Sequence, residues 1–341
     1  MAPFMSCGAR LTVYVLFASA FFVENGEAVV FALYITGILV AVLSAFMVRK
    51  FILPATDSSF IMELPPYLLP TLRNLIMHTW HRLKGFVVRA GKAIVAVVIV
   101  LNVLNSMGTD GTFGNENQEK SVLSEVGRKI TPIFTPMGID EDNWPATVGI
   151  FTGLFAKEVV VGTLDALYTT SDNNDEEFNF LDSMSEAIGS ISTNLTDVAN
   201  NLDDPLGIDM GDLSDAQGVA EAQQIDASTI AVIQNKFHGE WGAFVYLLFI
   251  LLYMPCVATI GAIVKEHGSY WAGFSMLWSF SVAYVLAVGL YQGVTWAEHP
   301  ESSMAWLIGL TVWQVLLTIV LFRSGKKQAI KENLIPMVKV G

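Results

Sequence analysis

The two cysteines of the chain, Cys7 and Cys256, are the side chains best suited to chemistry, and they stand in similar surroundings. Each follows a methionine by two positions, has a proline nearby and precedes small residues, in the stretches "PFMSCGA" and "YMPCVATIGA". Thiols are soft metal donors, and a pathway for a divalent ion needs weak, exchangeable ligation by thiol, carboxylate and carbonyl groups rather than a closed cage. The pattern fits two unrelated buried cysteines equally well, and no zinc-type spacing of cysteine and histidine is present.

Four further side chains are candidate donors. Glu158 follows Lys157 within an apolar segment, where charged residues are costly and usually functional. The alternative to a role as a metal ligand is an ion pair with Lys157 or another base. Glu63 precedes two consecutive prolines and would otherwise cap a surface helix. Met5 and Met254 are weaker candidates, because methionine is more often a packing residue.

The composition indicates an integral membrane protein. Of 341 residues, 53% are hydrophobic and 15% are charged, whereas soluble domains carry about 25% charged residues. The net charge of −13 is local, because residues 169–235 hold 14 of the 32 acidic residues and no Lys or Arg. A basic surface of the kind that binds nucleic acid is therefore not expected. Residues 169–241 are predicted to form an acidic, partly disordered loop, with short helices near 181–200 and 218–235.

Several largely uncharged runs are long enough to cross a bilayer as helices, since about 20 residues span the hydrocarbon. Pro255 interrupts one of them and removes a backbone donor, so we expect carbonyl groups and the Cys256 sulfur to face a passage instead of lipid. A run at 11–23 fits only a short or broken span. The full-length runs are 28–48, 86–107, 242–264, 270–297 and 302–322.

Basic residues at the ends of these runs orient the chain, because cytoplasmic loops carry an excess of Lys and Arg. Three basic residues just after position 322 place the C-terminus in the cytoplasm, and the basic residues between 49 and 92 place that segment there too. Both flanks of residues 145–168 are then outside. This glycine-punctuated segment is therefore predicted to be a re-entrant hairpin or a broken pair of half-helices. Residues 71–85 are predicted to form a separate, basic amphipathic helix on the cytoplasmic surface.

Four stretches together resemble the membrane region of the FeoB family, the bacterial ferrous iron transport protein B. They are "MSCGARL", "ELPPYLLPTL", "TGLFAKEVVVGTL" and "LLYMPCVATIGAI", in the expected order. The resemblance implies a polytopic permease of the bacterial cytoplasmic (inner) membrane that imports Fe²⁺. It makes Cys7 and Cys256, one in each of two Gate regions, candidates for the iron path, and it places Glu63 and Glu158 in matching motifs.

The fold class that follows is all-α, a polytopic transmembrane helical bundle with discontinuous or re-entrant helices and an acidic extramembrane insertion. The expected organisation is listed by residue range: 1–23, remnant of the first Gate region; 24–107, membrane helices with a cytoplasmic segment at 53–85; 108–144, periplasmic connection; 145–168, re-entrant segment; 169–241, acidic periplasmic loop; 242–322, three membrane helices with the rest of the second Gate region; 323–341, cytoplasmic tail.

The sequence also departs from the family. It contains no GxxxxGK[ST] phosphate loop, so we expect no enzymatic activity and no bound cofactor in this chain, with GTP acting only through a domain that it lacks. The resemblance to the C-terminal half of the family suggests a fragment or split-gene product. Expected partners are Fe²⁺, the lipid bilayer, a GTPase-bearing N-terminal half, small Feo accessory proteins and a second copy in a homo-oligomer. The alternatives are transport of another divalent metal or a nucleoside-like solute, or a non-transporting membrane fragment.

Overall fold

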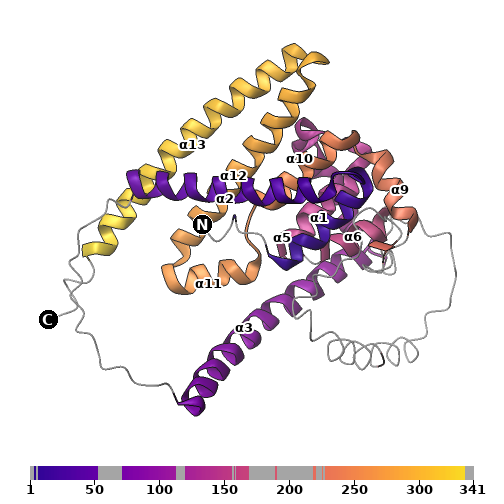
Figure 1. Cartoon of the computed structure of the whole chain (residues 1–341). Coiled ribbons are helices and arrows are strands. Elements are labelled where there is room, and N and C mark those ends of the chain that lie inside the picture. Colours follow the sequence, from indigo (N-terminus) through magenta and orange to yellow (C-terminus); the bar gives the residue numbers. More distant parts are fainter. Residues whose placement is uncertain are drawn as a thin grey trace.

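A computed structural model describes residues 4, 7–52, 71–112, 120–155, 157, 159–168, 189, 218–219, 225 and 227–334. Within these ranges the chain is helical, with one isolated bridge between Gly108 and Ser121 and no β-strand (Figure 1). The predicted all-α class is confirmed. Of the candidate donors, Met5, Glu63 and Glu158 lie outside the described residues, as does most of the acidic segment 169–241.

Four helical segments of the described chain are long and apolar enough to cross a membrane. They coincide with four of the predicted runs, so the chain is an integral membrane protein. The segments are α2 (Gly26–Phe51), α10 (Gly239–Leu252) taken together with α11 (Val257–His267), α12 (Ser269–Val294) and α13 (Pro300–Leu334). Side chains such as Phe31 and Val320 remain exposed on these helices, which suits contact with lipid rather than water.

Helix α3 (Leu72–Ser106) differs from its prediction. The sequence suggested a surface helix at 71–85 and a separate span at 86–107, but the structure shows one continuous 35-residue helix. The reason is that no proline follows Pro70 in this stretch, and single glycines such as Gly85 and Gly91 weaken a helix without ending it. The amphipathic and apolar parts are therefore two halves of one element.

Two short helices lie within the segment 144–168. α5 (Trp144–Phe155) and α6 (Val159–Tyr168) pack antiparallel, and their hydroxyl groups meet where Thr152 Oγ1 donates to Thr163 Oγ1 at 3.3 Å. Gly153 allows this approach, because a Cβ there would lie 2.5 Å from Cγ2 of Val160. The two half-helices form a hairpin, which we call the α5–α6 hairpin, with Lys157 at its tip.

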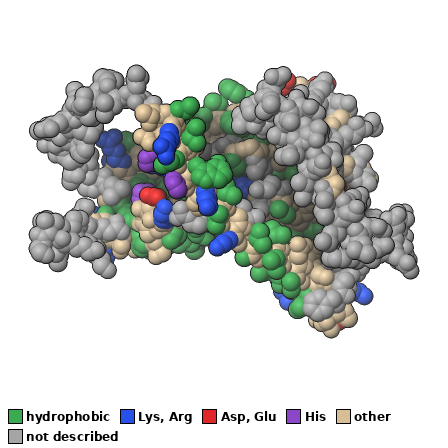
Figure 2. All heavy atoms as spheres, turned by 90° about the horizontal axis from the view of Figure 1, so that it is seen from below, with side chains coloured by type: hydrophobic (Ala, Val, Ile, Leu, Met, Phe, Trp, Pro, Cys, Tyr) green, Lys and Arg blue, Asp and Glu red, His purple; other side chains and the backbone are tan. Residues whose placement is uncertain are grey.

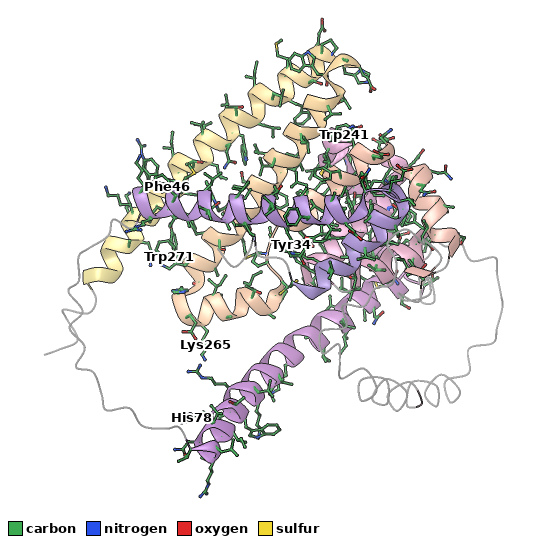
Figure 3. All side chains as sticks on the ribbon, in the orientation of Figure 1. Tyr34, Phe46, His78, Trp241, Lys265 and Trp271 are labelled. Atoms are coloured by element: carbon green, nitrogen blue, oxygen red, sulfur yellow. The ribbon has the colours of Figure 1, made fainter. Side chains whose placement is uncertain are left out.

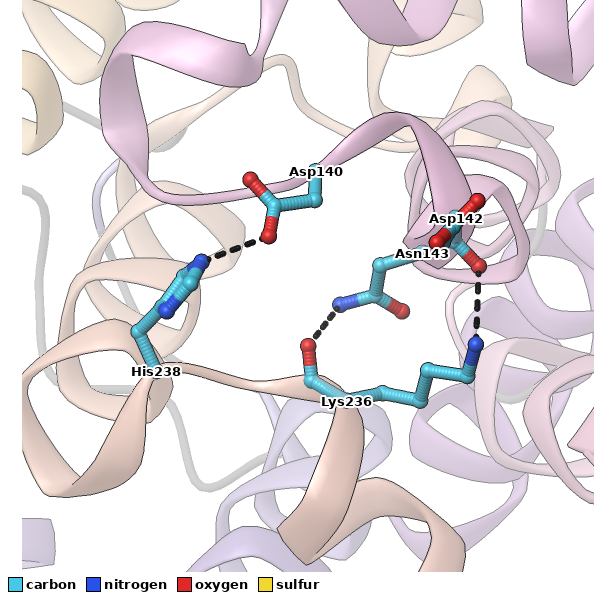
Figure 4. Close-up of polar contacts among 5 residues, drawn as sticks. All are labelled: Asp140, Asp142, Asn143, Lys236 and His238. Atoms are coloured by element: carbon cyan, nitrogen blue, oxygen red, sulfur yellow. Dashed lines mark hydrogen bonds and ion pairs between the residues drawn. The ribbon is translucent and has the colours of Figure 1, made fainter.

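The base of the α5–α6 hairpin is held closed by Asn143. Its Oδ1 accepts a hydrogen bond from the Tyr168 hydroxyl, and its Nδ2 donates to the Lys236 carbonyl at 3.0 Å. Figure 4 shows two further contacts beside it, from Lys236 Nζ to the Asp142 carbonyl and from His238 Nε2 to Asp140 Oδ2, at 3.4 and 2.7 Å. Both ends of the hairpin are thus at the same place, next to the start of α10, as a re-entrant segment requires.

The core lies around α10, most of whose side chains are fully buried. Phe17 of α1 (Gly8–Phe21) packs its ring 5.1 Å from Tyr246 of α10 and 5.1 Å from Phe237, which follows α9 (Ala227–Lys236). α1 covers most of the run at 11–23, and α9 overlaps the short helix expected at 218–235. A buried hydrogen bond from Trp278 Nε1 to Ser44 Oγ at 3.1 Å joins α12 to α2.

In Figure 3, Trp241, at the start of α10, lies in the upper half of the view, and Lys265 of α11 and His78 of α3 lie in the lower half. Figure 2, which views the molecule from below, shows Lys, Arg and His side chains among the described residues of the lower face.

A buried glutamine links α12 to two other elements, and its removal is expected to destabilise the fold. Gln292 Nε2 donates to the Pro136 carbonyl at 2.7 Å, and its Oε1 accepts from Ser303 Oγ at 2.9 Å. Gln292→Leu leaves the Pro136 carbonyl and the Ser303 hydroxyl buried without these hydrogen bonds. We therefore expect the free energy of unfolding to fall by about 2 kcal/mol, measured as a lower Tm in detergent. Thr311→Val, on the exposed face of α13, is the control and is expected to change the Tm little.

Candidate functional site

The two cysteines occupy equivalent positions in the fold. Cys7 is the N-cap residue of α1 and Cys256 is the N-cap residue of α11, both with extended backbone. Each half-helix is followed by a helix of 26 residues, α2 after α1 and α12 after α11. The similarity of the two sequence stretches therefore extends to the elements that follow them, the arrangement expected of an internal repeat around discontinuous helices.

The two half-helices lead away from the cysteines toward different parts of the molecule. The end of α1 contacts the end of α9, where the rings of Phe21 and Phe237 lie 6.2 Å apart. α11 ends at His267 and packs beside α3 (Figure 1). The N-terminus of each half-helix carries a partial positive charge from its unpaired backbone N–H groups. Both positive ends thus lie beside the thiols.

Lys157 lies at the tip of the α5–α6 hairpin and reaches the same region. Its side chain is 2% exposed, and its Nζ lies 4.5 Å from the centroid of the Tyr253 ring. It interacts electrostatically with Arg10, Cys7 and Cys256. Among the residues that the structure describes, its ammonium group has no hydrogen-bond partner. A buried amine thus lies over the Tyr253 ring and within electrostatic range of both thiols.

Tyr253 completes the group where α10 ends and the chain breaks before Pro255. Its side chain is buried and interacts electrostatically with Arg10, Cys7 and Cys256, the residues that also surround Lys157. Its hydroxyl lies over Gly153, where a Cβ would approach it to 2.7 Å. We call Cys7, Arg10, Lys157, Tyr253 and Cys256 the cysteine–lysine cluster.

The thiols differ in access. Cys7 is exposed, whereas Cys256 is half-buried and its Sγ lies 3.2 Å from Thr259 Oγ1. Within the described residues no three His, Cys, Asp or Glu side chains are grouped to hold a metal ion. An ion bound by both sulfurs would take further oxygen ligands from the broken backbone or from residues such as Glu158. Ligation of that kind is weak and exchangeable, which suits passage rather than storage.

Met254 is the remaining candidate in the described chain. Met254 lines an apolar cavity of about 170 Å³, with Phe134, Phe151 and Phe280 among its walls. Its placement there fits a packing side chain. Sequence reasoning missed Arg10 and Tyr253 as members of the site and treated Lys157 only as a partner for Glu158. Arg10 and Lys157 are each isolated in apolar sequence. That isolation could have identified them, because buried charges must find partners.

A polar cavity lies at the base of the α5–α6 hairpin, away from the cysteines. It has a volume of about 440 Å³ and is lined by two carboxylates and two imidazoles, together with apolar and hydroxyl groups. The titratable side chains are Asp140, His238, Glu298 and His299, of which the first two are paired. Carboxylates and imidazoles attract divalent cations, so this cavity is a suitable entrance on the Trp241 side of the molecule.

Comparison with known proteins gives consistent matches along the chain. Residues 30–82 match the family described as "Ferrous iron transport protein B C terminus", and residues 87–270 match the Gate family, described as "Nucleoside recognition". The chain is 42% identical over 334 residues to a protein of Salmonella typhimurium named "Fe(2+) transporter FeoB", and 41% identical over 332 residues to the protein of that name from Escherichia coli K12.

Each of these alignments covers 96% of this chain and 42% of the relative, so the chain spans about two-fifths of the length of these relatives. No solved structure matches the chain. The Gate match alone covers more than half of the 341 residues, and the ferrous iron transport match directly precedes it. The chain therefore belongs to the Gate family and carries the C-terminal ferrous iron transport protein B region in front of the Gate region.

Proposed function

We propose that this chain is the membrane permease portion of a ferrous iron uptake system of the bacterial cytoplasmic membrane. The observation that carries the proposal is the convergence of the N-termini of two short helices, each with a cysteine at the N-cap, on Lys157 at the tip of a hairpin from a third segment. Discontinuous helices that meet inside a membrane form the substrate sites of many transporters. The names of the relatives support Fe²⁺ as the cargo.

The path begins at the polar cavity on the outer side. Asp140 and Glu298 supply negative charge there, which raises the local concentration of cations. The ion then passes to the thiolates of Cys7 and Cys256, with carbonyl groups of the broken helices as additional ligands. Glu158 and Glu63 are proposed as further carboxylates of the path and Met5 as a weaker sulfur contact, whereas Met254 is proposed to pack in the apolar cavity. The ion stays mobile because only a few strong ligands hold it at each step.

Coupling to GTP is proposed to come from outside this chain, which itself holds no cofactor and hydrolyses no nucleotide. The partners we propose are the GTPase-bearing N-terminal half of the system, small Feo accessory proteins and a second copy of the chain. The proposed orientation places Lys265, Lys326 and the C-terminus in the cytoplasm, and Trp241 and the acidic segment 169–241 outside. The distribution of basic side chains over the molecule supports this orientation.

The test measures binding and uptake of ferrous iron-55 under reducing conditions. The purified chain in detergent is expected to bind Fe²⁺, and cells that express it together with a GTPase-bearing half are expected to accumulate more iron than cells with that half alone. If excess unlabelled Fe²⁺ reduces neither the binding nor the uptake of iron-55, specific transport is contradicted. Accumulation that requires the added half, with binding retained by the chain alone, supports the proposed division of labour.

A nucleoside-like solute is a second candidate cargo, because the Gate family is described by nucleoside recognition. Competition separates the candidates. Excess Zn²⁺, Mn²⁺ or nucleoside is added to the iron-55 binding assay, and each is then used as the labelled ligand. Fe²⁺ as the cargo predicts weak competition by nucleosides. Saturable nucleoside binding without Fe²⁺ binding would instead support the second candidate, and binding of neither would support a non-transporting membrane scaffold.

A further inference from the structure

A second polar cavity, of about 490 Å³, lies at the base of the α5–α6 hairpin, and the proposed iron path does not use it. We call it the Arg128 cavity. The guanidinium carbon of Arg128 lies 5.0 Å from the centroid of the Trp144 ring, and Lys236 Nζ donates to the Asp142 carbonyl at 3.4 Å (Figure 4). Two basic and two acidic side chains make its net charge zero. The lining residues are Arg128, Pro132, Glu141, Asp142, Trp144 and Lys236.

The Arg128 cavity lies where the chain enters the membrane. Lys236 is the last residue of α9 and precedes Gly239, the first residue of the span that begins with α10, by three positions. Trp144 is the first residue of the apolar helix α5, and Trp241, in the first turn of α10, is exposed. Tryptophan and basic side chains are typical of the layer of lipid headgroups. Lipid headgroups are therefore the molecules that surround this cavity.

The apolar cavity of about 170 Å³ lies deeper along the same helix, α5. Trp144 lines the Arg128 cavity, whereas Thr147 and Leu154, three and ten residues farther along α5, line the apolar cavity. At 1.5 Å per residue, the apolar cavity extends from about 5 to 15 Å beyond the Arg128 cavity along the helix axis. Apolar cavities of this size remain free of water and take up apolar molecules.

The end of α4 (Val122–Ile130) and the turn that follows it also line both cavities. Thr131 Oγ1 lies 3.1 Å from Thr147 Oγ1 and ties this segment to α5. Ile133 is exposed, so the apolar cavity reaches the surface of the molecule. The residues that alternate between the Arg128 cavity and the apolar cavity are, in chain order, Arg128, Ile130, Pro132 and Ile133.

We infer that the two cavities bind one phospholipid of the surrounding bilayer, with its headgroup in the Arg128 cavity and part of an acyl chain in the apolar cavity. Arg128 and Lys236 suit the phosphate, because guanidinium and ammonium groups donate charge-assisted hydrogen bonds to phosphate oxygens. The carboxylates of Glu141 and Asp142 suit a headgroup that also carries an ammonium group. The ligand is therefore a zwitterionic phospholipid with a terminal amine, as in phosphatidylethanolamine, rather than an anionic phospholipid.

The test measures binding of defined phospholipids to the purified, delipidated full chain by native mass spectrometry in detergent. The unaltered chain is expected to bind dioleoylphosphatidylethanolamine at least about fivefold more tightly than dioleoylphosphatidylglycerol, whose headgroup lacks the amine. Arg128→Gln is expected to weaken binding of dioleoylphosphatidylethanolamine at least about fivefold, because it removes a charged donor to the phosphate. Lys129→Gln, at the next position, removes an exposed lysine that lines neither cavity and is the matched control.

Two further variants test the headgroup and the acyl chain separately. Glu141→Gln combined with Asp142→Asn leaves the Arg128 cavity with two positive charges, so the preference is expected to reverse in favour of dioleoylphosphatidylglycerol. Ile133→Trp places a larger ring at the exposed edge of the apolar cavity. This variant is expected to weaken binding of dioleoylphosphatidylethanolamine and to leave unchanged the binding of glycerophosphoethanolamine, which has the same headgroup without acyl chains.

Three outcomes overturn the inference. They are equal lipid binding by the unaltered chain and Arg128→Gln, a preference of the unaltered chain for dioleoylphosphatidylglycerol, and binding of glycerophosphoethanolamine as tight as that of the lipid, which indicates a site for a soluble phosphate. If Arg128→Gln does not fold, Lys236→Gln gives the same comparison at an exposed side chain. The inference does not depend on Fe²⁺ as the cargo, because neither cysteine takes part in it, and its failure leaves the proposed function standing.

Discussion

Fe²⁺ binding to the purified chain is expected to fall at least about tenfold for each cysteine replaced, so that Cys7→Ser combined with Cys256→Ser abolishes measurable binding and uptake. A tenfold change corresponds to about 1.4 kcal/mol of binding free energy. Serine is close in size to cysteine, but its hydroxyl stays protonated at neutral pH and cannot replace a thiolate as a soft ligand. The measurement is an iron-55 binding isotherm for the two single variants and the double variant.

Met254→Leu is the matched control for loss of sulfur. Met254 lies two residues before Cys256, but its side chain lines the apolar cavity beside Phe134 and Phe280. Its replacement by leucine keeps an apolar side chain there and is expected to leave Fe²⁺ binding unchanged. Equal binding by the double cysteine variant and the unaltered chain, with helical content retained, would remove both thiols from the iron path.

Gly153→Ala is expected to disturb the α5–α6 hairpin strongly. The added Cβ would lie 2.5 Å from Val160 Cγ2 and 2.7 Å from the Tyr253 hydroxyl, both closer than van der Waals contact. α5 must then move away from α6 and from the end of α10. Overpacking of this kind costs about 1–3 kcal/mol, and here it also displaces the ring that faces Lys157. We expect a lower Tm in detergent and weaker Fe²⁺ binding together.

Gly162→Ala provides the comparison within the same hairpin. Gly162 lies in α6, and nothing lies within 4 Å of a Cβ added there. Alanine favours a helix over glycine by about 0.5–1 kcal/mol, so this substitution is expected to raise the Tm slightly and to leave binding intact. A Tm that falls equally in both variants would show that close packing at Gly153 is not what holds the hairpin together.

The helix breaks could be predicted because they follow from local covalent chemistry. Pro255 removes a backbone donor within an uncharged run, and the structure ends α10 at Leu252 and begins α11 at Val257. The hairpin at 145–168 followed from charge asymmetry and from its glycines. Gly153 packs closely against Val160, whereas Gly162 has open space beside it. The sequence alone does not distinguish these two glycines.

The parts that sequence could not supply depend on contacts between distant segments. Helix α3 runs unbroken where two elements were predicted, because a change from amphipathic to apolar sequence alters the surroundings of a helix and not its backbone hydrogen bonding. The cysteine–lysine cluster draws on three separate stretches. Lys157 and Tyr253 are nearly 100 positions apart, and only packing of the hairpin against α10 brings them together.

The contact between α1 and the end of α9 bears on how the chain is made. Gln234 Nε2 donates to the Ala20 carbonyl across a sequence separation of 214 residues, and Phe237 packs on Phe17. α1 is synthesised long before the residues that hold it in place. Cys7 is therefore synthesised 249 residues before Cys256, and the two thiols can come together only after both segments have been inserted.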